Sequence, residues 1–293
     1  MRVVHLTDLH VQTRPQLGEL FGKRLLGTAN LYLLGRRAKF DPAAQRAAVQ
    51  TALELEPDLV IITGDLTAQG TVSEFAAARE LLDPLLSRVS CAILPGNHDL
   101  YCEDAKVEDR MGQTFGEWMG PKRRLPYLVQ HGEVAVLAIE TCHPHLLSSG
   151  RVPPGELQAA VGMLAGLPSP RPFVFLALHY PLRNRDGAPY GPATRALDNA
   201  GAVEDFLLAT TKVDAVLHGH EHHGFRTELP TAAGPIPVLD PGASGYAFLP
   251  DQDRTAHLNC YEVDARGLHE VKRYRFDGRQ FLAEPGGAYA TGR

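Results

Sequence analysis

Side chains that bind metal ions recur along the chain, and each group comes directly after a short aliphatic run. The groups are Asp8-Leu9-His10, Gly64-Asp65, Gly96-Asn97-His98-Asp99, His179 and Gly219-His220-Glu221-His222. Asp, His and Asn in the absence of Cys are typical ligands of borderline to hard divalent ions such as Mn, Fe, Zn or Co. The pattern therefore favours a catalytic metal site over a structural zinc site.

The candidate ligands are too many for a single ion. Seven side chains qualify: Asp8, His10, Asp65, Asn97, His179, His220 and His222. Seven ligands fit two ions if one carboxylate bridges them, and two ions about 3.5 to 4 Å apart are the arrangement used in phosphoryl chemistry. The sequence thus predicts a binuclear hydrolase. The alternative is that these residues are turn caps and surface histidines.

The aliphatic runs predict the strands that must position these groups. Runs at residues 2–7, 58–63, 89–94, 133–139, 172–178 and 213–218 alternate with helices expected after Asp41-Pro42, from Ser73, after Pro153-Pro154 and near residues 200–209. This alternation is typical of an α/β fold, in which ligands bind at the carboxyl ends of the strands. We therefore expect the seven side chains to converge. Four further runs after His222, without helices, predict a second, largely antiparallel sheet.

Composition bounds the remaining possibilities. The chain has 293 residues and a formal net charge of −5, which argues against stable nucleic-acid binding. No apolar run reaches the roughly 18 residues of a membrane span, and the N-terminus lacks a signal-peptide pattern, so we expect a cytoplasmic protein. We expect four free thiols at Cys91, Cys102, Cys142 and Cys260. We also expect a single domain over residues 1–280 and a loose tail over 281–293.

The five motifs, in this order, resemble the signatures of the calcineurin-like metallophosphoesterases. The resemblance spans residues 1 to about 250 and implies a four-layer α-β-β-α sandwich of two mixed sheets flanked by helices. Within this family, the segments HLTDLH, GDLTAQG, PGNHD and GHEHH most resemble the corresponding sequences of the bacterial class III cyclic-nucleotide phosphodiesterases. The protein-phosphatase branch ends the third signature in Glu, where this chain has Asp99.

The resemblance also implies roles for individual residues. One ion would be held by Asp8, His10, Asp65 and His222, and the other by Asp65, Asn97, His179 and His220, with Asp65 as the bridge. A hydroxide shared by the two ions would attack phosphorus. His98 would donate a proton or hydrogen bond to the leaving oxygen, and Asp99 would hold the His98 ring.

The charge of such a centre bears on the substrate. Two divalent ions less two carboxylates and one hydroxide leave a single positive charge, which matches a phosphodiester monoanion. We expect a small phosphodiester substrate, with cyclic nucleotides such as 3′,5′-cAMP favoured. The alternatives are a lipid-linked pyrophosphate of the UDP-diacylglucosamine type, a phosphomonoester, or a non-catalytic scaffold.

Three further features fall outside the motifs. The stretch from Phe21 to Phe40 combines basic and apolar residues, and is expected to form either a helical flap over the site or a surface that contacts a membrane. His143 and His145 follow a predicted strand and are candidates for the pocket rim. His5 and His218 lie within predicted strands and are expected to be packed in the interior.

Overall fold

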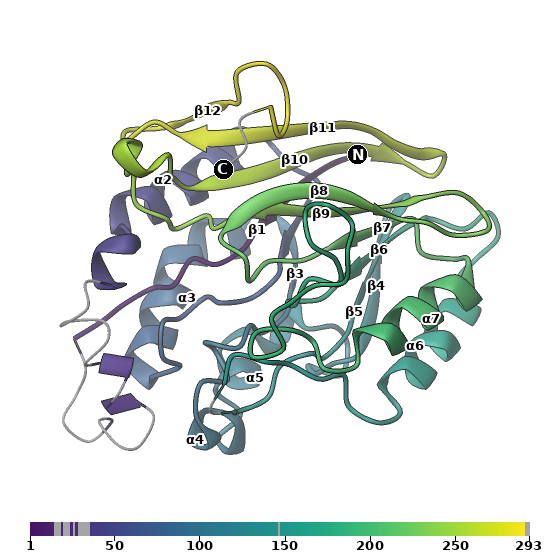
Figure 1. The fold of residues 1–293 in the computed structure, drawn as a ribbon, viewed down its shortest axis with the longest axis horizontal. Coiled ribbons are helices and arrows are strands. Elements are labelled where there is room, and N and C mark those ends of the chain that lie inside the picture. Colours follow the sequence, from purple (N-terminus) through teal and green to yellow (C-terminus); the bar gives the residue numbers. More distant parts are fainter. Residues whose placement is uncertain (15–18, 20–23, 26, 29–35, 146, 291–293) are drawn as a thin grey trace.

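Two six-stranded mixed sheets face each other in the computed structural model, and helices cover their outer faces (Figure 1). The structure describes residues 1–14, 19, 24–25, 27–28, 36–145 and 147–290. The expected α-β-β-α sandwich is therefore confirmed. Most of the predicted stretch 21–40, and with it the proposed flap or membrane-contacting surface, lies outside the described residues.

The first sheet has the strand order β12-β11-β10-β1-β2-β3. Its strands are β1 (Arg2–Leu6), β2 (Leu59–Ile62), β3 (Ser90–Ile93), β10 (His257–Asp264), β11 (Gly267–Phe276) and β12 (Phe281–Ala283). β1, β2 and β3 run parallel, with Val4 opposite Val60 and Val60 opposite Cys91. Parallel pairing places the carboxyl ends of these three strands at one edge of the sheet.

The second sheet has the order β4-β5-β6-β7-β9-β8. Its strands are β4 (Tyr127–His131), β5 (Val134–Ala138), β6 (Phe173–Ala177), β7 (Ala215–Leu217), β8 (His223–Leu229) and β9 (Ile236–Gly242). β4 was not predicted from the sequence. The prediction that the strands after His222 form one sheet was also wrong: β9 pairs parallel to β7, whereas β10 pairs antiparallel to β1, so the late strands extend both sheets.

The helices are α2 (Pro42–Glu54), α3 (Val72–Leu86), α4 (Glu103–Val107), α5 (Arg110–Phe115), α6 (Glu156–Ala165) and α7 (Ala200–Thr210). Short 3-10 turns occupy η2 (Arg36–Lys39), η3 (Gly116–Trp118) and η4 (Pro250–Gln252). Asp41 caps α2 as expected. The α3 helix begins earlier than expected, because Thr71 rather than Ser73 is the cap and forms a reciprocal capping box with Glu74.

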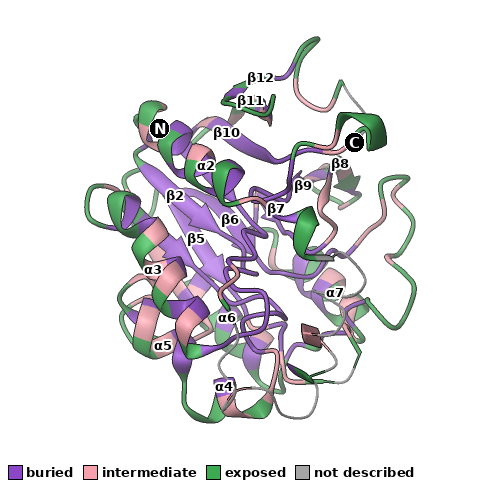
Figure 2. Ribbon diagram, turned by 90° about the vertical axis from the view of Figure 1, so that its left-hand side faces the viewer, coloured by how far each residue is buried: buried purple, intermediate pink, exposed green. Residues whose placement is uncertain are grey.

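Alternating side chains of the second sheet divide between two apolar layers. Val136, Phe175 and Leu217 belong to the main core that includes the first sheet. Leu137 and Leu176 instead pack with residues of α6 and α7. This period of two is what a sheet buried on both faces requires, and the strands are accordingly buried while the outer helix faces are exposed (Figure 2).

The C-terminal segment is attached to the first sheet rather than loose. β12 pairs antiparallel with β11, and Glu284 forms an ion pair of 3.3 Å with the fully buried Arg273. The hydroxyl of Tyr289 donates to the carbonyl oxygen of Asp240 at 3.0 Å and accepts from Asn259. The expected loose tail is corrected for residues 281–290, because buried polar partners hold this part of the segment; residues 291–293 lie outside the described part of the chain.

Two other expectations concern membranes and thiols. Within the described part of the chain, no helix has both the length and the apolar character that crossing a bilayer demands. The four cysteines are free thiols, as predicted, and Cys91, Cys142 and Cys260 are buried.

Candidate metal centre

The structure brings all seven candidate ligands together at the carboxyl ends of five strands. Asp8 and His10 follow β1, Asp65 follows β2, Asn97 follows β3, His179 follows β6, and His220 and His222 follow β7. Six of them are buried, and the His222 side chain is 20% exposed. Residues more than two hundred positions apart thus share one polar cluster.

The backbone at these strand ends makes unusually sharp turns. Asp8, His10, Asp65, His220 and His222 all have φ between 50° and 75°, a left-handed conformation that non-glycine residues seldom adopt. Each such residue costs on the order of 1 to 3 kcal/mol and persists where the surrounding structure enforces it. The turns let two residues of one loop, such as His220 and His222, both face the cluster.

Two motif glycines allow the loops to approach closely. A Cβ atom on Gly96 would lie 2.1 Å from Oδ1 of Asp65. A Cβ atom on Gly219 would lie 2.0 Å from Oγ1 of Thr7 and 2.5 Å from Oδ2 of Asp8. No side chain fits at those distances, so glycine at these positions is what permits the ligand loops to pack.

The first ligand group consists of Asp8, His10, Asp65 and His222, whose ligand atoms all lie within 4.8 Å of one another. Nε2 of His222 is 3.1 Å from Nε2 of His10 and 3.2 Å from Oδ1 of Asp8. Ligands bound to an ion at about 2.1 Å and at right angles lie about 3 Å apart, so the spacing fits a cation.

Hydrogen bonding at Asp8 also fits a cation. Its Oδ2 accepts from the Thr7 hydroxyl at 2.8 Å and from the His220 backbone N–H at 2.9 Å. Its Oδ1 is buried and has no hydrogen-bond partner among the described residues. A buried carboxylate oxygen without a partner is costly, and a metal ion satisfies it.

The second ligand group consists of Asp65, Asn97, His179 and His220. Oδ1 of Asn97 lies 2.9 Å from Nδ1 of His220 and 3.1 Å from Nε2 of His179. Nδ1 of His179 donates to the carbonyl oxygen of Thr63 at 2.8 Å, which fixes the ring and turns Nε2 toward the group. This group also has the donor set of a divalent ion.

Asp65 faces both groups through one oxygen. Its Oδ2 lies 3.4 Å from Nε2 of His10 and 3.5 Å from Nε2 of His179. Its Oδ1 accepts the backbone N–H of His98 at 2.7 Å. One carboxylate oxygen is therefore oriented by a neighbouring loop, and the other lies between the two sets of ligands.

The charges of the cluster favour a cation as well. Burial alone raises the pKa of Asp8, but the neighbouring His10 and His222 rings hold that pKa well below its usual range. Burial lowers the pKa of His10 and of His220, which keeps their rings neutral and able to bind a metal. Burial also lowers the pKa of His179, but the Asp65 carboxylate outweighs it and raises that pKa to about 9.

His98 lies beside the first group, and its ring centroid is 4.7 Å from that of His10. The expectation that Asp99 holds this ring is corrected: Nδ1 of His98 lies 2.5 Å from the carbonyl oxygen of Ala68. Asp99 instead accepts hydrogen bonds from the backbone of Gly96 and Thr67, both at 2.9 Å. Through these two bonds, Asp99 links the turn that carries Asn97 to the loop that follows Asp65. Burial, together with the nearby Asp65 charge, raises the pKa of Asp99 to about 6.

A cavity of about 470 Å³ opens above the cluster. Asp65, Asn97, His98, His220 and His222 line it, together with Phe40 and Tyr246. Three cationic residues, Lys39, Arg195 and Arg254, also line this cavity. Lys39 belongs to the basic stretch from Phe21 to Phe40, for which a flap over the site was one of the two expectations. Arg195 and Arg254 were not identified from the sequence, because they lie outside the motifs and nothing in their local pattern separates them from other basic surface residues.

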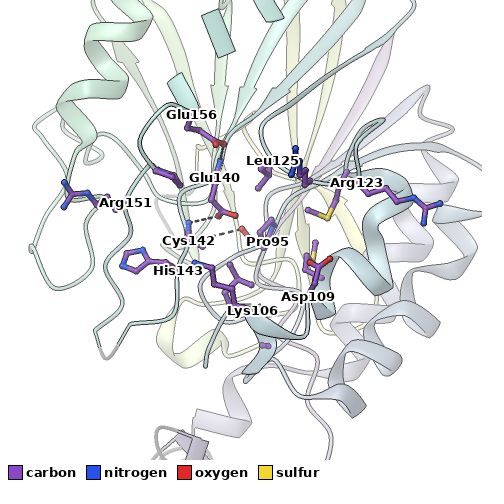
Figure 3. Close-up of a pocket in the computed structure, with 16 residues that line it drawn as sticks. Pro95, Lys106, Asp109, Arg123, Leu125, Glu140, Cys142, His143, Arg151 and Glu156 are labelled. Atoms are coloured by element: carbon purple, nitrogen blue, oxygen red, sulfur yellow. Dashed lines mark hydrogen bonds between the residues drawn. The ribbon is translucent and has the colours of Figure 1, made fainter. Parts of the chain in front are cut away.

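The remaining histidines have other surroundings. His5 and His218 are buried in the interior as predicted, and His5 bonds Oγ1 of Thr63 at 2.8 Å. His143 lies in a separate cavity with Glu140 and Glu156, which shares no lining residue with the cavity above the cluster (Figure 3). The structure therefore does not bring His143 to the rim of that cavity.

Comparisons with known proteins find similarity to phosphoesterases. A family model described as calcineurin-like phosphoesterase matches residues 1–224. A protein of Pseudoalteromonas sp. (strain SM9913) named "Probable cyclic nucleotide phosphodiesterase" is 26% identical over 78% of this chain and 74% of its own length. One of Vesicomyosocius okutanii with the same name is 26% identical over 56% of this chain and 62% of its own length.

Solved structures share the fold at low sequence identity. A dimetal phosphatase from Danio rerio superimposes with a TM-score of 0.60 at 12% identity, covering 96% of this chain and 98% of its own. A purple acid phosphatase from yellow lupin superimposes with a TM-score of 0.62 at 16% identity, covering 96% of this chain and 52% of its own.

Proposed function

The chain belongs to the calcineurin-like phosphoesterase family, a family of metal-dependent hydrolases, and on this basis we propose that it hydrolyses phosphodiesters at a binuclear metal centre. The favoured substrates are cyclic nucleotides such as 3′,5′-cAMP. The observation that carries the binuclear assignment is the position of Asp65 Oδ2, within 3.5 Å of histidine nitrogens from both ligand groups.

Each ion has four ligands in this proposal, and Asp65 is shared. One ion would be held by Asp8, His10, Asp65 and His222, and the other by Asp65, Asn97, His179 and His220. When bound, such a pair of ions polarises phosphoryl oxygens and lowers the pKa of a coordinated water. Mn, Fe, Zn and Co all suit this donor set.

The chain's own residues then bind the substrate and supply a proton. Lys39, Arg195 and Arg254 line the cavity and balance the charge of the phosphate. In its protonated form the His98 ring has an N–H on both nitrogens: Nδ1 donates to the Ala68 carbonyl, and Nε2 can donate to the leaving oxygen. Asp99 acts indirectly, by bracing the loop between Gly96 and His98.

Two observations favour a small diester. The cavity volume of about 470 Å³ is typical of sites for small molecules, and two relatives carry the name of cyclic nucleotide phosphodiesterases.

The test compares three substrates with the Mn-loaded protein: bis-p-nitrophenyl phosphate, p-nitrophenyl phosphate and 3′,5′-cAMP. We expect kcat/KM to be higher for the diester than for the monoester, and cAMP to be hydrolysed. Diester hydrolysis without cAMP turnover would contradict the substrate assignment. Absence of hydrolysis in protein that holds two metal ions would contradict the enzymatic proposal as a whole.

A further inference from the structure

A second cavity adjoins the one above the metal ligands. It has a volume of about 520 Å³ and shares Glu221, His223 and Arg254 with the metal cavity. The residues of the motif after β7 therefore have two different surroundings. His220 and His222 belong to the ligand groups, while Glu221 and His223 lie where the two cavities meet. A molecule whose phosphate reaches the metal ligands has this second cavity directly beside it.

Aromatic rings contribute much of the wall of the second cavity. His223 and Phe225 are two residues apart on β8, the edge strand of the second sheet, so their side chains project from the same face. The Phe225 ring packs against the ring of the buried His218, with ring centroids 5.2 Å apart. Tyr190 adds a third ring, and its hydroxyl donates to Glu221 at the boundary between the cavities.

The loop that supplies Tyr190 is preformed. The N–H of Asn184 donates to the carbonyl oxygen of Ala188 at 2.8 Å, and the N–H of Tyr190 donates to that of Leu182 at 3.1 Å. Arg183 is tied to Glu204 of α7 by an ion pair of 2.5 Å. A wall that is already ordered loses little conformational entropy when a ligand binds.

The polar groups of this cavity suit a heteroaromatic ligand. The Asn184 amide already donates to the Pro189 carbonyl oxygen at 3.1 Å, and Asp186 accepts from the N–H of Ala188 at 3.0 Å. An amide and a carboxylate have further donor and acceptor positions of the kind that pair with base edges, and aromatic faces stack on bases. An acyl chain fits poorly, because it would remove the charged groups of Arg185, Asp186 and Arg254 from water and could form no hydrogen bonds with them.

We propose that the second cavity is a nucleobase subsite, so that the substrate is a nucleoside phosphodiester recognised at its base as well as at its phosphate. This inference rests on the proposed function and makes its substrate class specific. Tyr190, His223 and Phe225 present the aromatic surface, and Asn184 and Asp186 face the base edge. Arg254, which lines both cavities, lies between base and phosphate.

The test is equilibrium binding of 5′-AMP against ribose 5-phosphate to the Mn-loaded protein, which requires no turnover. The two ligands share sugar and phosphate and differ in the base. We expect 5′-AMP to bind about tenfold more tightly, the size of one base stacked on an aromatic side chain. Equal affinity of the wild-type protein for the two ligands would overturn the proposal, and this comparison needs no variant.

Two substitutions at one position identify the group responsible. Tyr190→Phe keeps the ring and loses the hydroxyl bond to Glu221, so the advantage of 5′-AMP should persist; Tyr190→Ala should abolish most of it. Equal loss in both variants would overturn the stacking role. Base selectivity without diester hydrolysis would refute the proposed function alone, and diester hydrolysis without base selectivity would refute this subsite alone.

Discussion

Nδ1 of His98 lies 2.5 Å from the carbonyl oxygen of Ala68, a group that can only accept a hydrogen bond. Nδ1 therefore carries a hydrogen, and the protonated ring carries a second one on Nε2, the nitrogen that would donate to a leaving oxygen. A backbone carbonyl fixes the orientation of the His98 ring, so this orientation does not depend on another titratable side chain.

His98→Ala should keep both metal ions and lose most turnover. His98 is absent from both ligand groups, and general acids of this kind contribute about 10² to 10⁴-fold to rate. Elemental analysis of the purified variant, beside kcat for bis-p-nitrophenyl phosphate, checks both parts. Metal loss as complete as in an Asp65 variant would contradict the role given to His98.

Asp65→Ala should lose the metal pair as a whole, because one carboxylate oxygen faces both ligand groups. Removing His222, a member of the first group only, should instead weaken one ion more than the other. Metal content per protein, determined after dialysis for Asp65→Ala and His222→Ala, distinguishes the two patterns. Retention of one full equivalent in Asp65→Ala would show that Asp65 is not shared.

Gly219→Ala should disrupt the metal centre, because its Cβ would lie 2.0 Å from Thr7 Oγ1 and 2.5 Å from Asp8 Oδ2. Overpacking of this kind lowers the free energy of unfolding by about 1 to 3 kcal/mol and would displace Asp8.

Gly162→Ala is the matched control. Gly162 is exposed within α6, and nothing lies within 4 Å of its added Cβ. The change should raise the free energy of unfolding by about 0.5 to 1 kcal/mol. Denaturant unfolding and metal content test the pair; similar behaviour of both variants would refute the close-approach argument.

Glu74 should make stability depend on pH. Burial raises its pKa to about 7, although N–H groups of Gln69 and Thr71 oppose the shift. A raised pKa in the folded state means that its contribution is full below the unfolded pKa of about 4.5 and is lost as pH rises to about 7, by up to about 3 kcal/mol.

Glu74→Gln should therefore flatten the change in unfolding free energy between pH 5 and pH 8, measured by denaturant titration. The exposed Glu80→Gln is the control and should retain the wild-type change. If Glu74→Gln retained the same change, another group would be responsible for it.

The sequence predicted those parts of the molecule that local pattern determines. Aliphatic runs marked β1, β2, β3, β5, β6 and β7, and the polar residues after them marked the ligand groups, because parallel strands end at a common edge. The partition of the late strands could not be predicted, since it depends on which sheet edge is free. Nor could the partner of His98, because the Ala68 carbonyl is a backbone group that any residue would supply.

The cationic and aromatic walls of the two cavities were equally inaccessible from sequence. Arg195, Arg254 and Tyr190 lie in loops whose composition resembles ordinary surface, and only the fold brings them beside the ligands. The C-terminal segment was misjudged for a related reason: its Gly and Ala content suggested a loose chain, whereas Glu284 and Tyr289 have buried partners far away in sequence.

Metal titration tests the central claim most directly. Protein stripped with a chelator is titrated with Mn²⁺ while bound metal and hydrolysis of bis-p-nitrophenyl phosphate are followed together. We predict no hydrolysis without metal and activity that reaches its maximum only as the second equivalent binds. Full activity at one equivalent, or hydrolysis by the stripped protein, would contradict a binuclear centre built around Asp65.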